Sequence, residues 1–249
     1  MDSLDLQRAR DTVEHLPRAS GIGTLGERTL HAVLKHLMEP DISCHEKRIG
    51  SFVADIARPD GIVEIQTRGM DRLRRKLDTF LEHSPVTVVY PIASVKYLVW
   101  IDPVSGETTA RRKSPRRGTP LDAFGELYKI KSYLRNPRLS ICLLTLEIEE
   151  YRLKNGWSND GKKGSTRCER LPLSLEKAWM LQTPADYAAL LPQDLPLPFT
   201  SGELCGKVPQ SRAACQTVLH VLHAVGAVER IGKRSNSYLY RPVGLPDSR

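Results

Sequence analysis

A pair of short apolar segments joined by a tight turn is the feature that most constrains the fold of this chain. Residues 51–57 read SFVADIA and residues 62–67 read IVEIQT, and the sequence Arg58-Pro59-Asp60-Gly61 lies between them. Proline fixes one backbone angle and glycine permits unusual ones, so this sequence is typical of a turn. The two segments are therefore predicted to form a β-hairpin.

Helical and strand patterns alternate around this hairpin. Apolar residues recur at helical spacing in residues 24–38, 68–83 and 121–134. Short apolar runs typical of strands occupy residues 87–93, 97–102 and 139–148. Thr24 and Glu27 have the spacing of a capping box at the start of the first helix. This order predicts a mixed α/β domain over residues 1–150, with a mixed sheet flanked by helices.

The rest of the chain has a different composition. Residues 151–171 contain glycine, basic residues and little periodicity, which predicts a long exposed loop. Residues 172–197 are predicted to hold one helix and a proline-rich linker. In residues 198–249, a capping box at Thr200 and Glu203 begins a short helix, a second helix covers residues 211–225, and a hairpin follows over residues 227–241. This order resembles a winged helix, whose second helix enters the major groove of DNA.

The charge of the chain favours a polyanionic partner. The 249 residues carry 37 basic and 29 acidic side chains, which gives a formal charge of +8. The excess is concentrated, because residues 107–171 alone carry 15 basic against 8 acidic side chains. A surface of this kind attracts nucleic acid.

Several other classes of protein are not indicated. The N-terminal residues do not resemble a signal peptide, and no run approaches the roughly 18 apolar residues that a membrane span requires. The five cysteines include no CxxC pair, so neither a disulfide framework nor a zinc knuckle is expected. The GxSxG, P-loop and GxGxxG motifs are absent. We therefore expect a cytoplasmic protein that does not bind membranes, and a homodimer is left open.

Two carboxylates lie in the predicted hairpin. Asp55 is in the middle of the first strand, and Glu64 lies in the second. A half-buried carboxylate in a strand is costly unless a partner compensates it. Together with a backbone carbonyl, the two acids supply oxygen ligands of the kind that Mg²⁺ prefers. The alternative is that they form ion pairs on a solvated sheet face with Arg68, Arg72 or Lys96.

At these positions the chain resembles the PD-(D/E)XK nuclease superfamily. The family hairpin carries an aspartate, then, about ten residues later, Glu-X-Lys, and a helix follows; Asp55 and Glu64-Ile65-Gln66 match this pattern, with Gln66 in place of lysine. The resemblance covers about residues 20–148 and implies a restriction-endonuclease-like fold. It implies a Mg²⁺ or Mn²⁺ ion held by Asp55, Glu64 and the Ile65 carbonyl. It also implies that Gln66 orients the attacking water and that Glu27 of the preceding helix contributes a further acid.

The glutamine at position 66 departs from the family pattern. Lysine would lower the pKa of a metal-bound water, whereas a neutral amide can only position the water by hydrogen bonds. Some active restriction endonucleases of the superfamily carry glutamine at this position. The substitution therefore leaves catalysis open.

Basic side chains in three segments are predicted to contact nucleic acid, with a plain solvated surface as the alternative. Four follow the second hairpin strand: Arg68, Arg72, Arg75 and Lys76. Five lie within seven residues of one loop, where they repel one another unless a polyanion binds: Arg111, Arg112, Lys113, Arg116 and Arg117. In the winged-helix segment, Gln210, Ser211 and Arg212 are predicted to contact base edges, and Lys233 and Arg234 to contact phosphates.

These features together predict a DNA-binding protein with metal-dependent endonuclease activity, with duplex DNA as the favoured substrate. Two alternatives stay open. The nuclease fold could be catalytically inactive and bind DNA as a regulator or a component of a defence system. The winged helix could instead dock a protein.

Overall fold

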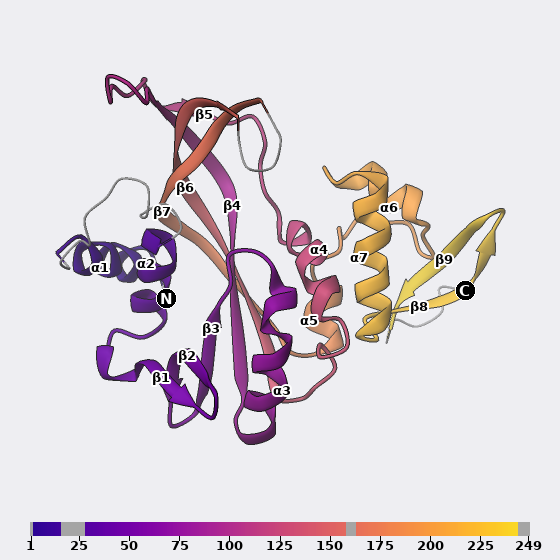
Figure 1. Cartoon of the computed structure of the whole chain (residues 1–249). Helices are drawn as coiled ribbons and strands as arrows, with labels where there is room; N and C mark the ends of the chain where they lie inside the picture. Colours follow the sequence, from indigo (N-terminus) through magenta and orange to yellow (C-terminus); the bar gives the residue numbers. More distant parts are fainter. Residues whose placement is uncertain (1, 16–27, 158–162, 244–249) are drawn as a thin grey trace.

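The computed structural model describes residues 2–15, 28–157 and 163–243 of the chain (Figure 1). Its helices are α1 (Ser3–Glu14), α2 (Arg28–Met38), α3 (Arg74–His83), α4 (Phe124–Leu127), α5 (Pro184–Ala188), α6 (Ser201–Lys207) and α7 (Arg212–Ala224). Its strands are β1 (His45–Ile49), β2 (Phe52–Arg58), β3 (Gly61–Ile65), β4 (Val86–Ile101), β5 (Arg112–Lys113), β6 (Leu139–Trp157), β7 (Lys163–Leu181), β8 (Val228–Arg234) and β9 (Ser237–Pro242).

Seven strands form one mixed sheet in the order β1-β2-β3-β4-β6-β7, and β5 pairs with β4 outside this path. The pairs β3–β4 and β4–β6 are parallel, and the other neighbouring pairs are antiparallel. The apolar run at the start of β6 is continuous because helices cover both faces of the sheet there. This confirms the prediction of a mixed α/β fold with a mixed sheet flanked by helices.

Two hydrophobic clusters lie on opposite faces of the sheet. On one face, α1 and α2 pack on Val63, Val89 and Leu144. On the other face, α3 and α4 pack on residues such as Val88 and Ile141 (Figure 1). The hairpin of β2 and β3 therefore lies between two helical layers. Helices of both layers can reach the side chains at its end.

The predicted hairpin around residues 58–61 is confirmed. β2 and β3 are antiparallel, and Arg58 pairs with Gly61 across the turn. Gly61 has φ +154°, and a Cβ there would lie 2.9 Å from the Pro85 carbonyl oxygen. Glycine is therefore required for the turn to approach β4. The strand β1, which was not predicted, adds a mostly exposed edge beside β2.

The predicted loop at residues 151–171 is wrong for the residues that the structure describes. β6 continues to Trp157 and β7 begins at Lys163, so both strands extend the sheet beyond the predicted boundary at residue 150. Charged side chains in these strands pair across to the neighbouring strand, as Arg167 does with Glu150. This pairing stabilises strands whose composition resembles that of a loop.

The predicted linker at residues 172–197 is also largely structured. Its first part belongs to β7, α5 follows, and the side chains of Leu191 and Leu195 are buried. The residues predicted as two strands, 87–93 and 97–102, form the single strand β4 with an irregularity between Ala93 and Val95. The last strand of the sheet along the chain, β7, ends at Leu181.

The predicted helix at residues 121–134 is broken into short turns. α4 is preceded by a 3-10 turn, Pro120–Ala123, and followed by another, Tyr128–Ile130. The Arg74 side chain donates a 2.8 Å hydrogen bond to the Lys129 carbonyl oxygen, and the Tyr133 N–H bonds to the carbonyl three residues before it. These bonds replace the pattern of a continuous α-helix.

The C-terminal elements follow the predicted order of two helices and a hairpin. The capping box at Thr200 and Glu203 is present, and Ser211 caps α7 with its side chain. Their buried side chains are not a separate core, because Leu204 and Val218 belong to the same cluster as Phe124 beneath the sheet. The last six residues of the predicted segment 198–249 lie outside the described part of the chain.

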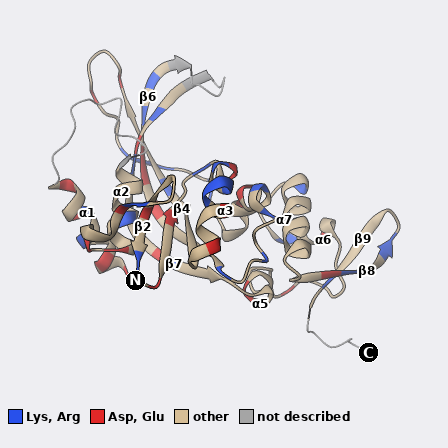
Figure 2. Cartoon of the chain, turned by 60° about the horizontal axis from the view of Figure 1, so that its bottom comes forward, with Lys and Arg blue, Asp and Glu red and all other residues tan. Residues whose placement is uncertain are grey.

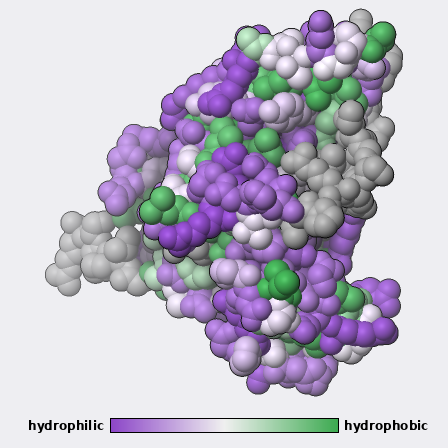
Figure 3. Space-filling view, turned by 90° about the vertical axis from the view of Figure 1, so that its left-hand side faces the viewer, coloured by the Kyte–Doolittle hydropathy of each residue, from purple (hydrophilic) through white to green (hydrophobic). Residues whose placement is uncertain are grey.

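The surface on the side of α1 and α2 is mainly polar. Figure 3 shows hydrophobic residues there in small groups surrounded by hydrophilic ones. Among the described residues, no helix combines the length and the apolar composition needed to cross a bilayer.

Candidate active site

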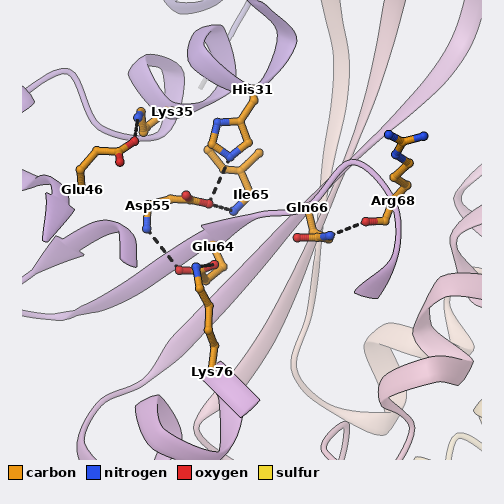
Figure 4. A network of polar contacts seen from close by, with 9 residues as sticks. All are labelled: His31, Lys35, Glu46, Asp55, Glu64, Ile65, Gln66, Arg68 and Lys76. Atoms are coloured by element: carbon orange, nitrogen blue, oxygen red, sulfur yellow. Dashed lines mark hydrogen bonds and ion pairs between the residues drawn. The ribbon is translucent and has the colours of Figure 1, made fainter. Parts of the chain in front are cut away.

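The hairpin places Asp55 of β2 and Glu64 of β3 opposite one another (Figure 4). The last ladder pair before them is Ile56 with Val63, and the next step in the antiparallel register joins the two acids. The Asp55 N–H donates to Glu64 Oε1 at 3.2 Å, and the Ile65 N–H donates to Asp55 Oδ2 at 2.8 Å. The two carboxylates are thus held together by backbone hydrogen bonds.

Each acid has a cationic or titratable partner from a helix. His31 of α2 lies with Nε2 3.3 Å from Asp55 Oδ2, and Lys76 of α3 lies with Nζ 2.8 Å from Glu64 Oε2. The ion pairs with Arg68, Arg72 or Lys96 that formed the alternative prediction are not the ones observed for these acids within the described residues. The two helical layers therefore converge on the acid pair from opposite sides of the sheet.

The two carboxyls differ in proton affinity. Burial and, second, the neighbouring Asp55 charge raise the pKa of Glu64 to about 7 against the opposing effect of Lys76. For Asp55, burial also acts to raise the pKa, but the hydrogen bond and charge of His31 and the Ile65 N–H outweigh it, so its pKa is lowered. Glu64 is only 2% exposed, whereas the Asp55 side chain is 18% exposed.

The acid pair lies in a cleft of about 570 Å³. Helix α2 contributes His31 and Lys35 to its wall, and the segment after β3 contributes Arg68 and Arg72. A carboxylate pair bordered by several cations has the charge pattern that a phosphodiester and a divalent cation require together. The cleft therefore brings together the acids and part of the first predicted basic segment.

Gln66 lies at the end of β3 and holds the turn that follows. Its side-chain nitrogen donates to the Arg68 carbonyl and, at 3.3 Å, to the Gly69 carbonyl, while its backbone N–H donates to Val89. Figure 4 shows the amide beside the turn that carries Arg68. Its nitrogen is thus engaged with backbone, which differs from the predicted role of orienting a water molecule.

The residues fit a hard divalent cation in type. Asp55 and Glu64 provide two carboxylates, and Ile65 lines the same cleft. The raised pKa of Glu64 reflects two adjacent acids that a cation would stabilise. Glu27, the further acid that the family resemblance implies, lies outside the described residues. Within the described part of the chain, no three His, Cys, Asp or Glu side chains gather as a metal site.

The structure separates the remaining basic residues into different surroundings. Arg75 is exposed on α3 but does not line the cleft. In the predicted loop, Arg111 pairs with Glu149 at 3.3 Å and stacks on the Tyr97 ring, and Arg116 pairs with Asp122. The other three residues of this loop are exposed: Arg112, Lys113 and Arg117. Figure 2 shows basic residues on β6, α3, α7 and the tip of the β8–β9 hairpin.

The predicted base contact at Gln210 requires a correction. Gln210 is 8% exposed, and its side-chain nitrogen donates to Thr119 Oγ1 at 2.7 Å, so it connects the C-terminal elements to the sheet domain. Arg212 is exposed at the start of α7, while the Ser211 hydroxyl is engaged in capping that helix. At the hairpin tip, Arg234 pairs with Glu203 at 2.9 Å, and Lys233 is exposed.

Two functional candidates were missed or placed differently by sequence reasoning. His31 was not assigned a role, and Lys76 was assigned to nucleic-acid contact rather than to the acid pair. Both lie on a helix face whose orientation depends on tertiary packing. The signal in the sequence was that Lys76 follows Glu64 by twelve residues, as the first helix after the hairpin begins.

A comparison with protein-family models matches residues 28–182 to a domain of unknown function, DUF8091. The chain belongs to the DUF8091 family. The matched region runs from the start of α2 to the end of β7, so the DUF8091 domain includes β6 and β7 entirely. A protein of Treponema pallidum (strain Nichols), named "Uncharacterized protein", is 28% identical over 233 residues, which cover 92% of this chain and 90% of that protein. No solved structure gives a significant match.

Proposed function

We propose that this DUF8091 protein is a metal-dependent nuclease that binds duplex DNA and hydrolyses its phosphodiester bonds. The observation that carries the proposal is the acid pair of Asp55 and Glu64 in a cleft of about 570 Å³ that cationic side chains also line. The family description names no activity, so the chemistry of the site supports the proposal by itself.

In this proposal each side chain of the cleft has a separate role. Asp55, Glu64 and the Ile65 carbonyl hold Mg²⁺ or Mn²⁺, which when bound polarises the phosphate and lowers the pKa of a coordinated water. Arg68 and Arg72 hold the phosphate backbone. Lys76, which is 2.8 Å from Glu64, supplies the ammonium that the family pattern has at position 66. Gln66 then acts as a positioning residue for the turn that carries Arg68.

The finer description of the fold belongs to the same proposal. The sheet with its acid hairpin would be restriction-endonuclease-like, and α6, α7, β8 and β9 would be a winged helix. Its supporting features are the cap of α7 at Ser211 and the exposed Arg212 and Lys233, which have the positions of a groove contact and a backbone contact.

The test is cleavage of supercoiled plasmid with Mg²⁺ or Mn²⁺, followed by single-stranded and branched substrates. The wild-type protein should cleave, and Asp55→Ala and Glu64→Ala should abolish cleavage while DNA binding stays similar or becomes tighter. Glu176→Ala, at an exposed carboxylate outside the cleft, is the matched control. Cleavage that survives Glu64→Ala would refute the assignment of the site.

One observation favours a second candidate, a catalytically inactive DNA-binding protein. His31 and Lys76 already provide hydrogen-bond partners for both acids, so the pair can be stable without a cation. Wild-type protein that binds DNA but cleaves no substrate with either metal would favour this candidate.

A further inference from the structure

A group of charges outside the cleft lies on the part of the sheet that extends beyond β3. We call this part the arm: residues 95–101 of β4, 147–157 of β6 and 163–174 of β7, at the top of Figure 1. Glu150 of β6 is 1% exposed and is approached by three cations. They are Lys96, with Nζ 3.5 Å from Oε2, Arg152, with Nη2 2.5 Å from Oε1, and Arg167, with Nε 3.3 Å from Oε2.

The charges of this Glu150 cluster do not balance. Burial alone would raise the pKa of Glu150, but the three cations outweigh it and lower the pKa, so the carboxyl carries a negative charge. Three cations around one carboxylate leave a surplus of positive charge. Burial is the main cause that lowers the pKa of Lys96; Glu150 opposes it, and the two neighbouring arginines act in the same direction as burial. An anion beside the cluster would relieve the surplus.

The cations are accessible to such an anion. The side chains of Lys96 and Arg152 are each 29% exposed, and that of Arg167 is 43% exposed. The Arg152 guanidinium also lies 6.0 Å from the Trp100 ring. Glu150 itself is almost fully enclosed, so an approaching ligand would meet the guanidinium and ammonium groups rather than the carboxylate.

The cluster lies on the face of the sheet from which His31 of α2 reaches Asp55, whereas Lys76 reaches Glu64 from the other face. Cys142, Leu144, Leu146 and Ile148 of β6 point into the hydrophobic cluster beneath α1 and α2, and Glu150 continues this alternation. Helix α2 also supplies His31 and Lys35 to the wall of the cleft. Because α1 and α2 cover the sheet itself, a ligand that extends from the cleft past α2 on this side would reach the Glu150 cluster.

The spacing between them suits a nucleic acid. Val89 of β4 pairs with Ile65 in the cleft, and Lys96 lies seven residues further along β4. At about 3.3 Å per residue, shortened by the irregularity after Ala93, this separation is roughly 20 Å. Phosphates of one DNA strand are about 3.4 Å apart along the axis, so the separation corresponds to roughly six base pairs.

We propose that the Glu150 cluster binds a backbone phosphate of the nucleic acid, roughly six base pairs from the phosphodiester in the cleft. This inference rests on the proposed function, because it takes the nucleic acid in the cleft as its starting point. It assigns to the arm the role of a second anchor, which fixes the direction in which the substrate lies along the sheet.

The test is DNA binding by full-length protein, measured by fluorescence anisotropy between 50 and 200 mM salt with a long duplex of about 24 base pairs. Arg167→Gln should reduce the magnitude of the log K against log[salt] slope on the long duplex by about 0.9, and should weaken binding about fivefold at 0.15 M salt. Arg135→Gln removes an exposed arginine before β6, at the other end of the strand from the arm, and is the matched control.

A second variant distinguishes ligand binding from a structural role. Glu150→Gln adds one positive charge to the surplus, so it should lower the thermal stability yet tighten binding and steepen the slope on the long duplex. Loss of stability without a change in slope, or an unchanged slope in Arg167→Gln, would overturn the inference. If the wild-type protein still cleaves DNA in that case, the proposed function survives alone. If the wild-type protein neither binds nor cleaves, both proposals fail.

Discussion

At the scale of single residues, the cleft depends on two carboxyls that the backbone holds in contact and two helices that neutralise them. Asp55 and Glu64 were predicted as a pair from their places in the hairpin, and the structure brings them together. Their partners, His31 and Lys76, could not be predicted, because a helical pattern identifies the buried face but not which polar residue meets a given strand.

The proton affinity of Glu64 makes the stability of the metal-free protein depend on pH. The folded pKa is about 7, against an ordinary value of 4.5, so between these values the folded state binds more protons than the unfolded state. The contribution of Glu64 to stability is therefore fully present below pH 4.5 and lost as the pH rises through 7. The glutamine in Glu64→Gln does not titrate. The melting temperature of this variant should therefore rise relative to that of the wild-type protein between pH 5 and pH 8.

Thermal unfolding followed by circular dichroism, in a chelating buffer at the two pH values, measures this difference. Glu176→Gln, at an exposed position, is the control. An equal difference in melting temperature between Glu64→Gln and the wild-type protein at pH 5 and pH 8 would show that Glu64 is ionised over the whole range.

Gln66 should affect cleavage less than the acids do. Gln66→Ala removes the hydrogen bonds to the Arg68 and Gly69 carbonyls and leaves both carboxylates in place. A loss of ~1.4 kcal/mol corresponds to a rate about tenfold lower in single-turnover cleavage. Gln66→Lys, which restores the commoner family pattern, should retain or raise the rate. A loss in Gln66→Ala as complete as that in Glu64→Ala would mean that Gln66 acts on the reacting atoms.

At the scale of elements, periodicity predicted the strands in the apolar core and failed where charge is paired across the sheet. The hairpin of β2 and β3 and the start of β6 follow from apolar runs and turn chemistry. The outer halves of β6 and β7 read as a loop, because stabilising partners of their basic residues, such as Glu150 for Arg167, lie on the neighbouring strand. The turns that replace the helix at residues 121–134 likewise depend on the distant Arg74.

The basic loop at residues 111–117 should contribute to DNA binding unequally. All four arginines are exposed, but Arg111 and Arg116 already have carboxylate partners, whereas no described carboxylate pairs with Arg112 or Arg117. Replacing Arg112 and Arg117 by alanine should therefore weaken binding almost equally for all sequences, and should reduce the salt slope by about 0.9 for each phosphate that the variant no longer neutralises. Anisotropy titrations over a range of salt measure the slope. A larger effect from replacing Arg111 and Arg116 would contradict this order.

At the scale of the whole molecule, the C-terminal helices and the sheet domain share one hydrophobic cluster. Val218 and Leu222 of α7 belong to the same cluster as Phe124 and Leu127 of α4, and Gln210 bonds to Thr119. The sequence predicted a winged helix over residues 198–249 but not this shared core, because capping and turn signals mark the boundaries of elements and do not show what their apolar faces pack against.

Unfolding should therefore be a single cooperative transition. Leu222 is fully buried, and Leu222→Ala should destabilise the full chain by about 2–5 kcal/mol without splitting the transition. Urea unfolding followed by fluorescence and by circular dichroism measures whether the two probes coincide. Two separate transitions, of which Leu222→Ala shifts only that of the C-terminal elements, would show that these elements fold independently.

The proposed activity requires that Asp55 and Glu64 form a cation site for phosphodiester hydrolysis. Anomalous diffraction from crystals soaked in Mn²⁺ tests it most directly, with Glu64→Gln crystals as the control. We expect an anomalous peak bound by both carboxylates in the wild-type protein and a weaker or absent peak in the variant. A wild-type crystal with no peak in the cleft, and with His31 and Lys76 still bonded to the two acids, would contradict it.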